Sequence, residues 1–110
     1  MALSEFERKR CERIVGAFIQ GRRPPPHIRP KLDLGFRVTG QSVEIFEIRP
    51  RWNNPKEELE HSVAKATFVK SQSAWRVYWQ RQDLKWHSYE PSPVVATLEE
   101  FVNLVNEDAN

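Results

Sequence analysis

The stretch LDLGFRVTGQSVEIFEI, residues 32–48, decides the fold. In its first half, apolar side chains alternate with polar residues or glycine, and this period of two predicts a β-strand with one buried face. The dipeptide at 40–41 is typical of a two-residue hairpin turn with glycine first. Counting outward from this turn sets the register. It pairs Val38 with Val43 and Phe36 with Ile45 on one face, and Arg37 with Glu44 and Gly35 with Phe46 on the other.

The same alternation predicts the rest of the sheet. We expect strands over 63–69 and 74–81, joined through Ser71-Gln72, and a fifth strand that follows a turn at Gln82-Asp83 and ends at Pro91 and Pro93. The polar segment from Pro50 to His61 is predicted to be a loop. The expected pairs are Phe68 with Trp75, Ala66 with Val77, Ala64 with Trp79, and Trp79 with Trp86, so that the tryptophans share the core face.

Helices are predicted at both ends of the chain. Ser4 and Glu7 form a capping box ahead of a helix over 5–20, and Gly21 is placed to end it in a left-handed conformation. The prolines at 24–26 then predict an extended connector. A second capping box, Thr97 with Glu100, begins a terminal helix. Its apolar stripe consists of Leu98, Phe101, Val102 and Val105.

These elements predict an α+β fold: an N-terminal helix, a five-stranded antiparallel sheet and a C-terminal helix, with both helices on one sheet face. The 110 residues fit a single domain, 1–110, and a composition of 39 % hydrophobic and 11 % aromatic residues argues against disorder. The longest apolar run, Ile14 to Ile19, is too short to span a membrane, and the charged start differs from a signal peptide. We therefore expect a cytoplasmic protein.

Three segments of the chain also resemble a known family. These are SEFERKR at 4–10, VEIFEIRPRW at 43–52, and WRVYW at 75–79 with LKWH at 84–87. Over nearly the whole chain the sequence is similar to a small bacterial family, domain of unknown function 3024. The resemblance implies a bacterial, cytosolic protein that forms a complete unit, and it carries no catalytic residue or substrate to this chain.

The reverse face of the sheet's second half is the main candidate site. The predicted register places cations beside aromatic rings on it. Single-stranded nucleic acid needs both, cations for phosphates and flat rings on which bases stack. The alternatives are a solvated sheet face and a face covered by a partner subunit. The predicted residues are Lys65, Arg76, Tyr78, Lys85, His87 and Tyr89.

Three carboxylates form a second candidate. Asp33, Glu44 and Glu47 lie near one another in the predicted hairpin, as in a magnesium-dependent nuclease that places an acid on one strand and an acid-x-lysine on the next. Arg49 stands where the lysine belongs, and its guanidinium is a poor proton shuttle. The register also puts Asp33 and Glu47 on opposite faces, so an ion pair between Glu47 and Arg49 is the simpler interpretation.

The remaining reactive residues give weaker signals. His27, His61 and His87 lack the spacing of zinc ligands, and Cys11 lies on the apolar stripe of the first helix, where it acts as a small hydrophobe. In the predicted loop, Arg51 and Trp52 could anchor a partner protein, or the indole folds back onto the core.

The net charge of +2 conceals an uneven distribution. Residues 1–31 carry eight basic and three acidic side chains, whereas residues 91–110 carry none and four. Such ends can attract each other within one chain or between two chains.

Taken together, these features predict a non-enzymatic binding domain without a cofactor, metal site or membrane contact. Single-stranded nucleic acid on the sheet face is the sharpest hypothesis. A protein partner, including a second copy of the chain, is the alternative, and a metal-dependent nuclease is the third.

Overall fold

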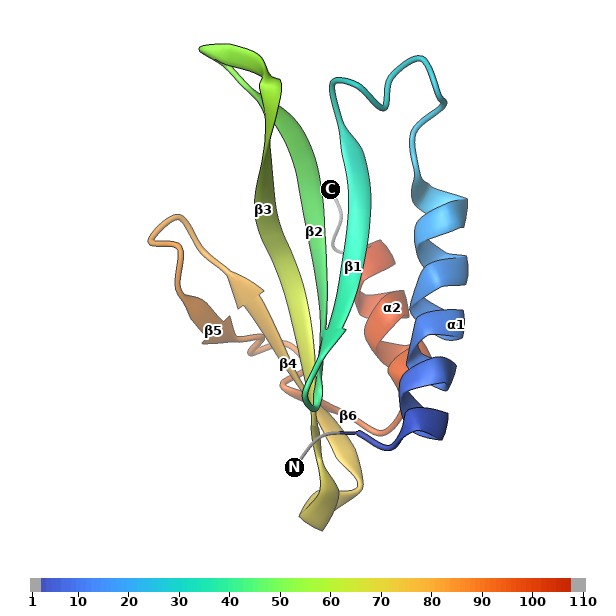
Figure 1. The fold of residues 1–110 in the computed structure, drawn as a ribbon. Helices are drawn as coiled ribbons and strands as arrows, with labels where there is room; N and C mark the ends of the chain where they lie inside the picture. The colour runs from blue at the N-terminus through green and yellow to red at the C-terminus, as the bar shows by residue number, and fades with distance from the viewer. Residues whose placement is uncertain (1–2, 108–110) are drawn as a thin grey trace.

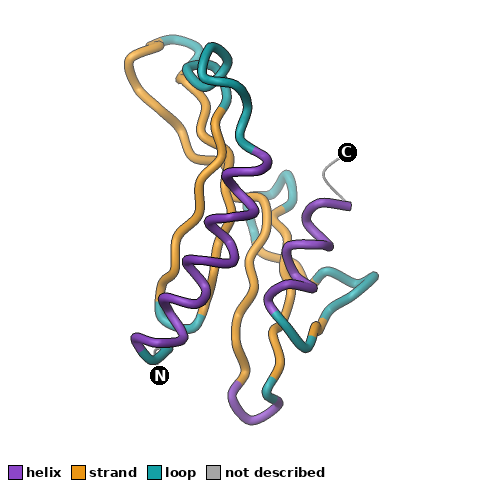
Figure 2. Tube along the Cα trace, turned by 90° about the vertical axis from the view of Figure 1, so that its right-hand side faces the viewer, coloured by secondary structure: helices purple, strands orange, loops and turns teal. Residues whose placement is uncertain are grey.

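The computed structural model describes residues 3–107, which form one antiparallel sheet and two helices (Figure 1). In chain order the elements are α1 (Glu5–Arg22), β1 (Asp33–Thr39), β2 (Ser42–Arg51), β3 (Asn54–Val69), the short 3-10 helix η1 (Lys70–Gln72), β4 (Ala74–Gln80), β5 (Trp86–Ser88), β6 (Val94–Val95) and α2 (Leu98–Glu107). The sheet order is β1-β2-β3-β4-β5, and β6 also pairs with β4. Both helices lie on one side of the sheet (Figures 1 and 2), so the predicted α+β architecture is confirmed.

The two registers derived from the 40–41 turn and from the 71–72 region are confirmed. Val38 pairs with Val43 and Phe36 with Ile45 across β1 and β2, and Ala66 pairs with Val77 across β3 and β4. Gly40 has φ +60°, which a side chain would make costly, and this explains why the turn begins with glycine.

The predicted loop over Pro50 to His61 is wrong. This segment continues β2 to Arg51 and starts β3 at Asn54, so the two strands form a long hairpin whose far part we call the arm, residues 49–60. The arm extends beyond β4 and β5 (Figure 1). The side chains at 49, 51–54 and 56–60 are all exposed, so this segment lacks the alternation by which a half-buried strand is recognised.

The predicted register between β4 and β5 is also wrong, by one residue. Trp79 pairs with His87 rather than Trp86, because the loop holds three residues, 82–84, instead of two. Leu84 adopts φ +62°, the left-handed conformation typical of the last residue in a three-residue hairpin loop. A one-residue shift moves every side chain of β5 to the opposite face.

The end of the sheet differs in a second respect. Pro91 and Pro93 interrupt the last strand rather than end it, since β6 resumes pairing with β4 after them and brings Val95 opposite Trp75. The excursion over 89–93 remains attached to β4 because the Tyr89 N–H donates to the Val77 carbonyl and the Val77 N–H donates to the Pro93 carbonyl, both at 2.9 Å.

The N-terminal ends of both helices agree with the prediction, whereas the C-terminal end of α1 differs from it. In the Ser4 and Glu7 capping box, each side chain accepts a hydrogen bond from the backbone N–H of the other residue. At the start of α2, the Glu100 N–H donates to the Thr97 hydroxyl at 3.2 Å. However, α1 passes through Gly21 and ends at Arg22, and Gly21 does not take the predicted left-handed conformation. Arg23 has φ −60° and ψ 137°, because a residue before proline is pushed out of the helical region.

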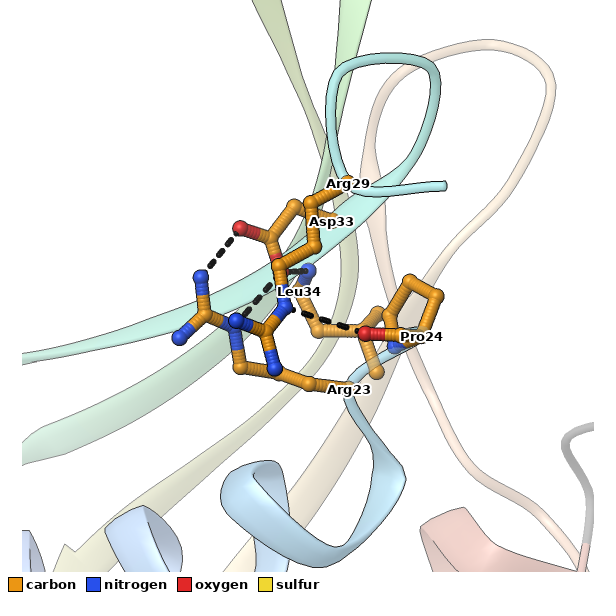
Figure 3. A network of polar contacts seen from close by, with 5 residues as sticks. All are labelled: Arg23, Pro24, Arg29, Asp33 and Leu34. Atoms are coloured by element: carbon orange, nitrogen blue, oxygen red, sulfur yellow. Dashed lines mark hydrogen bonds and ion pairs between the residues drawn. The ribbon is translucent and has the colours of Figure 1, made fainter. Parts of the chain in front are cut away.

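The connector from α1 to β1 is turned rather than extended, and a polar network holds it (Figure 3). Arg23 donates twice to Asp33, from Nε at 2.8 Å and from Nη2 at 2.6 Å. Arg29 Nε reaches back to the Pro24 carbonyl at 3.0 Å. The bidentate pair therefore ties the end of the helix to the first residue of the sheet.

The core lies between the helices and the helix side of the sheet. Val15, Val43 and Phe101 are completely buried there, and each stabilises the fold by about 1.5–3 kcal/mol. Cys11 is buried among them, as expected from its place on the helix stripe. The other core residues are Ile19, Val38, Ile45, Ala64, Ala66, Trp75, Val77, Val95, Leu98 and Val102.

Two glycine substitutions should change stability in opposite directions. A Cβ at Gly35 would lie 2.7 Å from Phe46 Cε2, so Gly35→Ala should lower the free energy of unfolding by about 1–3 kcal/mol. Gly21 is helical with nothing within 4 Å, so Gly21→Ala should raise it by about 0.5–1 kcal/mol. Urea unfolding measures both changes. A Gly35→Ala variant as stable as the wild type would contradict the close contact with Phe46.

Acid should weaken the link between Arg23 and Asp33. The hydrogen bonds from Arg23 hold the pKa of Asp33 below its ordinary value of 3.8, so the pair stabilises the fold above that pH and its contribution is lost as the pH falls through the lower, folded-state pKa. The stability gap between wild type and Asp33→Asn should therefore close between about pH 5 and pH 2. Glu58→Gln, on the exposed arm, is the control. A gap that does not narrow in acid would refute this role for Asp33.

Candidate functional site

The side of the sheet opposite the helices carries the candidate site, which we call the open face. The register sets its members, because side chains paired across neighbouring strands share a face. Its central row crosses the sheet from β1 to β5 as Arg37, Glu44, Lys65, Tyr78 and Ser88. The flanking residues are Ser42, Thr67 and Arg76 on one side and Phe46, Ser62, Gln80 and Trp86 on the other.

Lys65 forms the centre of the open face together with two aromatic rings. Its Nζ lies 4.6 Å from the ring centre of Trp86 and 5.3 Å from that of Tyr78. Both distances are within the range of cation–π attraction. Trp86 belongs to this cluster only because of the shifted β5 register, and the prediction that placed it on the core face is therefore wrong.

The same shift removes three predicted residues from the row on the open face, Lys85, His87 and Tyr89, since Lys85 now lies opposite Arg81 rather than Gln80. His87 lies opposite Trp79, on the helix side, where its Nε2 is 2.9 Å from Asp83 Oδ2. Tyr89 packs against the hydrophobic core. Lys85 lies at the end of the turn, and its backbone N–H and the His87 ring hold the pKa of Asp83 below its ordinary value. The expectation that Arg76, Tyr78, His87 and Tyr89 project together is wrong.

The cations of the open face differ in how they are engaged. Arg37 forms an ion pair with Glu60 and lies over the Phe46 ring at 4.6 Å. Lys65 and Arg76, by contrast, have no carboxylate partner within residues 3–107, and Arg76 is exposed. These two side chains are the ones that can meet an incoming anion.

The tip of the arm carries the other predicted partner-binding residues. Trp52 is 91 % exposed, so the indole does not fold back onto the core as one interpretation expected. Arg51 is held instead by Glu57, with 2.8 Å between Nη1 and Oε2. The tip therefore presents a single large apolar ring beside a neutralised charge pair.

The three carboxylates of the nuclease hypothesis are engaged separately. Asp33 is bound by Arg23, Glu44 accepts from the Ser62 hydroxyl, and Glu47 pairs with Arg49 at 2.9 Å as the simpler interpretation predicted. Glu47 lies opposite Leu34 whereas Asp33 lies opposite Ile48, which confirms the opposite faces. Across residues 3–107, no three His, Cys, Asp or Glu side chains are grouped so that they could hold a metal ion.

A cleft of about 570 Å³ opens on the helix side, between the C-terminal ends of α1 and α2 and the sheet. Sequence reasoning missed this helix-side cleft, because it depends on where two helices end above a twisted sheet. Its walls are mainly apolar, with Arg22 and Glu47 as charged members and His61, Tyr78 and Tyr89 as further titratable ones. Ser62, Tyr78 and Gln80 of the open face also line it, so the cleft reaches the edge of that face. The apolar side chains include Phe18, Leu34, Trp79, Tyr89, Leu104 and Val105.

Comparison with known families agrees with the resemblance seen in the sequence. The family described as Domain of unknown function (DUF3024) matches residues 3–110. This chain belongs to that family. No curated protein and no solved structure matches the sequence of this DUF3024 domain. Within residues 3–107, neither helix combines the length and the apolar character that crossing a membrane requires.

The thiol of this DUF3024 domain should be inert in the folded state. Cys11 is 4 % exposed, and burial raises the pKa of its thiol, so little thiolate forms at neutral pH. We expect a disulfide reagent such as DTNB to react at least about tenfold more slowly with the native protein than with protein in urea. Ser71→Cys, at an exposed turn, provides a fast-reacting control. Rapid native labelling of Cys11 would contradict its burial.

Proposed function

We propose that this DUF3024 domain is a non-enzymatic binding domain whose open face takes single-stranded nucleic acid. The observation that carries the proposal is the position of Lys65 between Tyr78 and Trp86 on the side of the sheet that the helices leave uncovered. Cations and stackable rings in one shallow surface are what single strands bind.

The energies favour replacement of Lys65 by a base. A cation–π contact at an exposed site contributes about 0.5–1 kcal/mol, whereas a base stacked on an aromatic side chain contributes about 1–3 kcal/mol. A base that displaces Lys65 from either ring therefore gains more than is lost. The ammonium group, once freed, would be available to neutralise a phosphate of the same strand.

Arg76 extends this surface along β4. It lies two residues from Tyr78 on the same strand and therefore on the same face, about 7 Å away along the chain. Thr67 and Ser42 continue the row as neutral hydrogen-bonding groups, with 2.8 Å between their hydroxyl oxygens. The supported arrangement has stacking on Tyr78 and Trp86, and charge neutralisation by Lys65 and Arg76.

Fluorescence anisotropy with labelled oligo(dT) and oligo(U) tests this function. We expect binding that weakens with salt, and Arg76→Ala should lower the slope of log affinity against log salt by about 0.7, the contribution of one phosphate contact. Trp86→Leu should weaken binding by about 5- to 100-fold and leave the slope unchanged. Arg13→Ala, an equal charge change on α1, should have little effect. Absence of binding at low salt, or equal losses in Arg13→Ala and Arg76→Ala, would refute the proposal.

A further inference from the structure

The helix-side cleft opens at the point where β3 separates from β4. The two strands pair as far as Ala64 and Trp79, and β3 then continues into the arm without β4 beside it (Figure 1). The pairing of β2 with β3 skips Val63, and such a bulge bends a strand and redirects its side chains. Trp79 lies on the helix side at this point and is 38 % exposed. The cleft therefore gives a ligand access to a large ring of the sheet.

The walls of the cleft suit a ligand with an apolar body. Phe18 of α1, Trp79 of β4 and Tyr89 contribute aromatic rings, and Leu34 of β1 and Leu104 of α2 contribute aliphatic side chains. The volume of about 570 Å³ lies within the range of about 300–1,000 Å³ found for pockets that hold small molecules. Such pockets hold the body of the ligand by apolar contact and fix its orientation with a few polar groups.

Arg22 is the polar group placed to orient such a ligand. It lies in the wall of the cleft at the end of α1, and its Nη1 donates to the side chain of Asn106 on α2. This hydrogen bond holds the guanidinium between the two helix ends and uses one of its five N–H donors. Within residues 3–107, Arg22 has no carboxylate partner, and its side chain is exposed. The remaining donors can therefore bind an anionic head group, for which the planar guanidinium is well suited.

The acidic residue of the wall does not cancel the charge of Arg22. Glu47 is neutralised by Arg49, which donates to its Oε2 from Nε at 3.1 Å and from Nη2 at 2.9 Å. In the part of the chain that the structure describes, no ion pair joins Glu47 to Arg22. His61, directly opposite Glu47, adds a positive charge whenever it is protonated. The unpaired charge of the cleft is therefore positive.

We infer that the helix-side cleft binds an apolar monocarboxylic acid, with its carboxylate on Arg22 and its body against Phe18, Trp79 and Leu104. A neutral ligand of the same body gains the apolar contact alone, and a cationic ligand is repelled by Arg22. This site lies beyond the proposed function, and it does not depend on nucleic acid at the open face. The residues whose variants test it, Arg22 and Leu104, belong to the helices.

Two fluorescent probes that differ in one anionic group test the class of ligand. Anilinonaphthalene sulfonate carries the anion, and phenylnaphthylamine is the same skeleton without it. We expect Arg22→Gln to weaken binding of the sulfonate by about 5- to 30-fold and to leave the neutral probe within about twofold. Arg13→Gln, an equal charge loss on the same helix, should change neither. Equal losses of the sulfonate in both variants, or no binding of either probe to the folded protein, would overturn the inference.

A variant that fills the cleft tests where the probes bind. Leu104→Trp places an indole in the cleft and should abolish binding of both probes. Leu84→Trp adds the same side chain at an exposed turn and should bind both as the wild type does. Circular dichroism checks that each variant is folded. Unchanged binding to a folded Leu104→Trp variant would refute the assignment to the cleft.

Sodium decanoate tests the site in the wild-type protein, without a substitution. In proton–nitrogen correlation spectra, the indole N–H signal of Trp79 should shift as decanoate is added, and that of Trp52, at the tip of the arm, should stay in place. Decanol should shift the Trp79 signal only at higher concentration, and Arg22→Gln should remove this difference between acid and alcohol. A Trp86 signal that moves in place of the Trp79 signal would overturn the assignment in favour of the open face.

Discussion

Each hairpin turn in this domain determines which side chains face the helices and which face solvent. A β-strand alternates its side chains strictly, so the number of loop residues sets the parity of the following strand. The two-residue turn at 40–41 directs Val43 and Ile45 into the core and Glu44 to the open face. The three-residue loop at 82–84 has the same influence on β5, and it brings Trp86 rather than His87 beside Lys65.

The β1–β2 register was predicted correctly because its turn residue revealed its own conformation. Gly40 signals a left-handed turn position, and the whole β1 and β2 register followed from it. Leu84 occupies a similar left-handed position, but leucine gives no such signal, and the β5 register was therefore wrong by one residue. The arm escaped prediction for a different reason. Alternation marks a strand only when one of its faces is buried, and the arm side chains at 49, 51–54 and 56–60 are all exposed.

The candidate site was predictable to the same extent as the register. Lys65, Arg76 and Tyr78 lie on strands whose pairing was derived correctly, and they share the open face as expected. His87 and Tyr89 depended on the last turn and lie on the other side. The helix-side cleft depends on where α1 and α2 stop relative to the sheet. Local patterns encode the helix stripes but not the distance between their ends, and for this reason no sequence signal marked the cleft.

The small net charge of the domain limits what electrostatics can contribute on the open face. Within residues 3–107, Lys65 and Arg76 are the cations of this face that form no ion pair, and Glu44 lies directly opposite Lys65. Under the proposed function, two phosphate contacts would give a shallow salt dependence, because each contact contributes a slope of about 0.7. Most of the affinity would then have to come from bases stacked on Tyr78 and Trp86, at about 1–3 kcal/mol each. For this reason a domain of such small net charge would depend on its aromatic rings, and hence on the β5 register that places Trp86 beside Lys65.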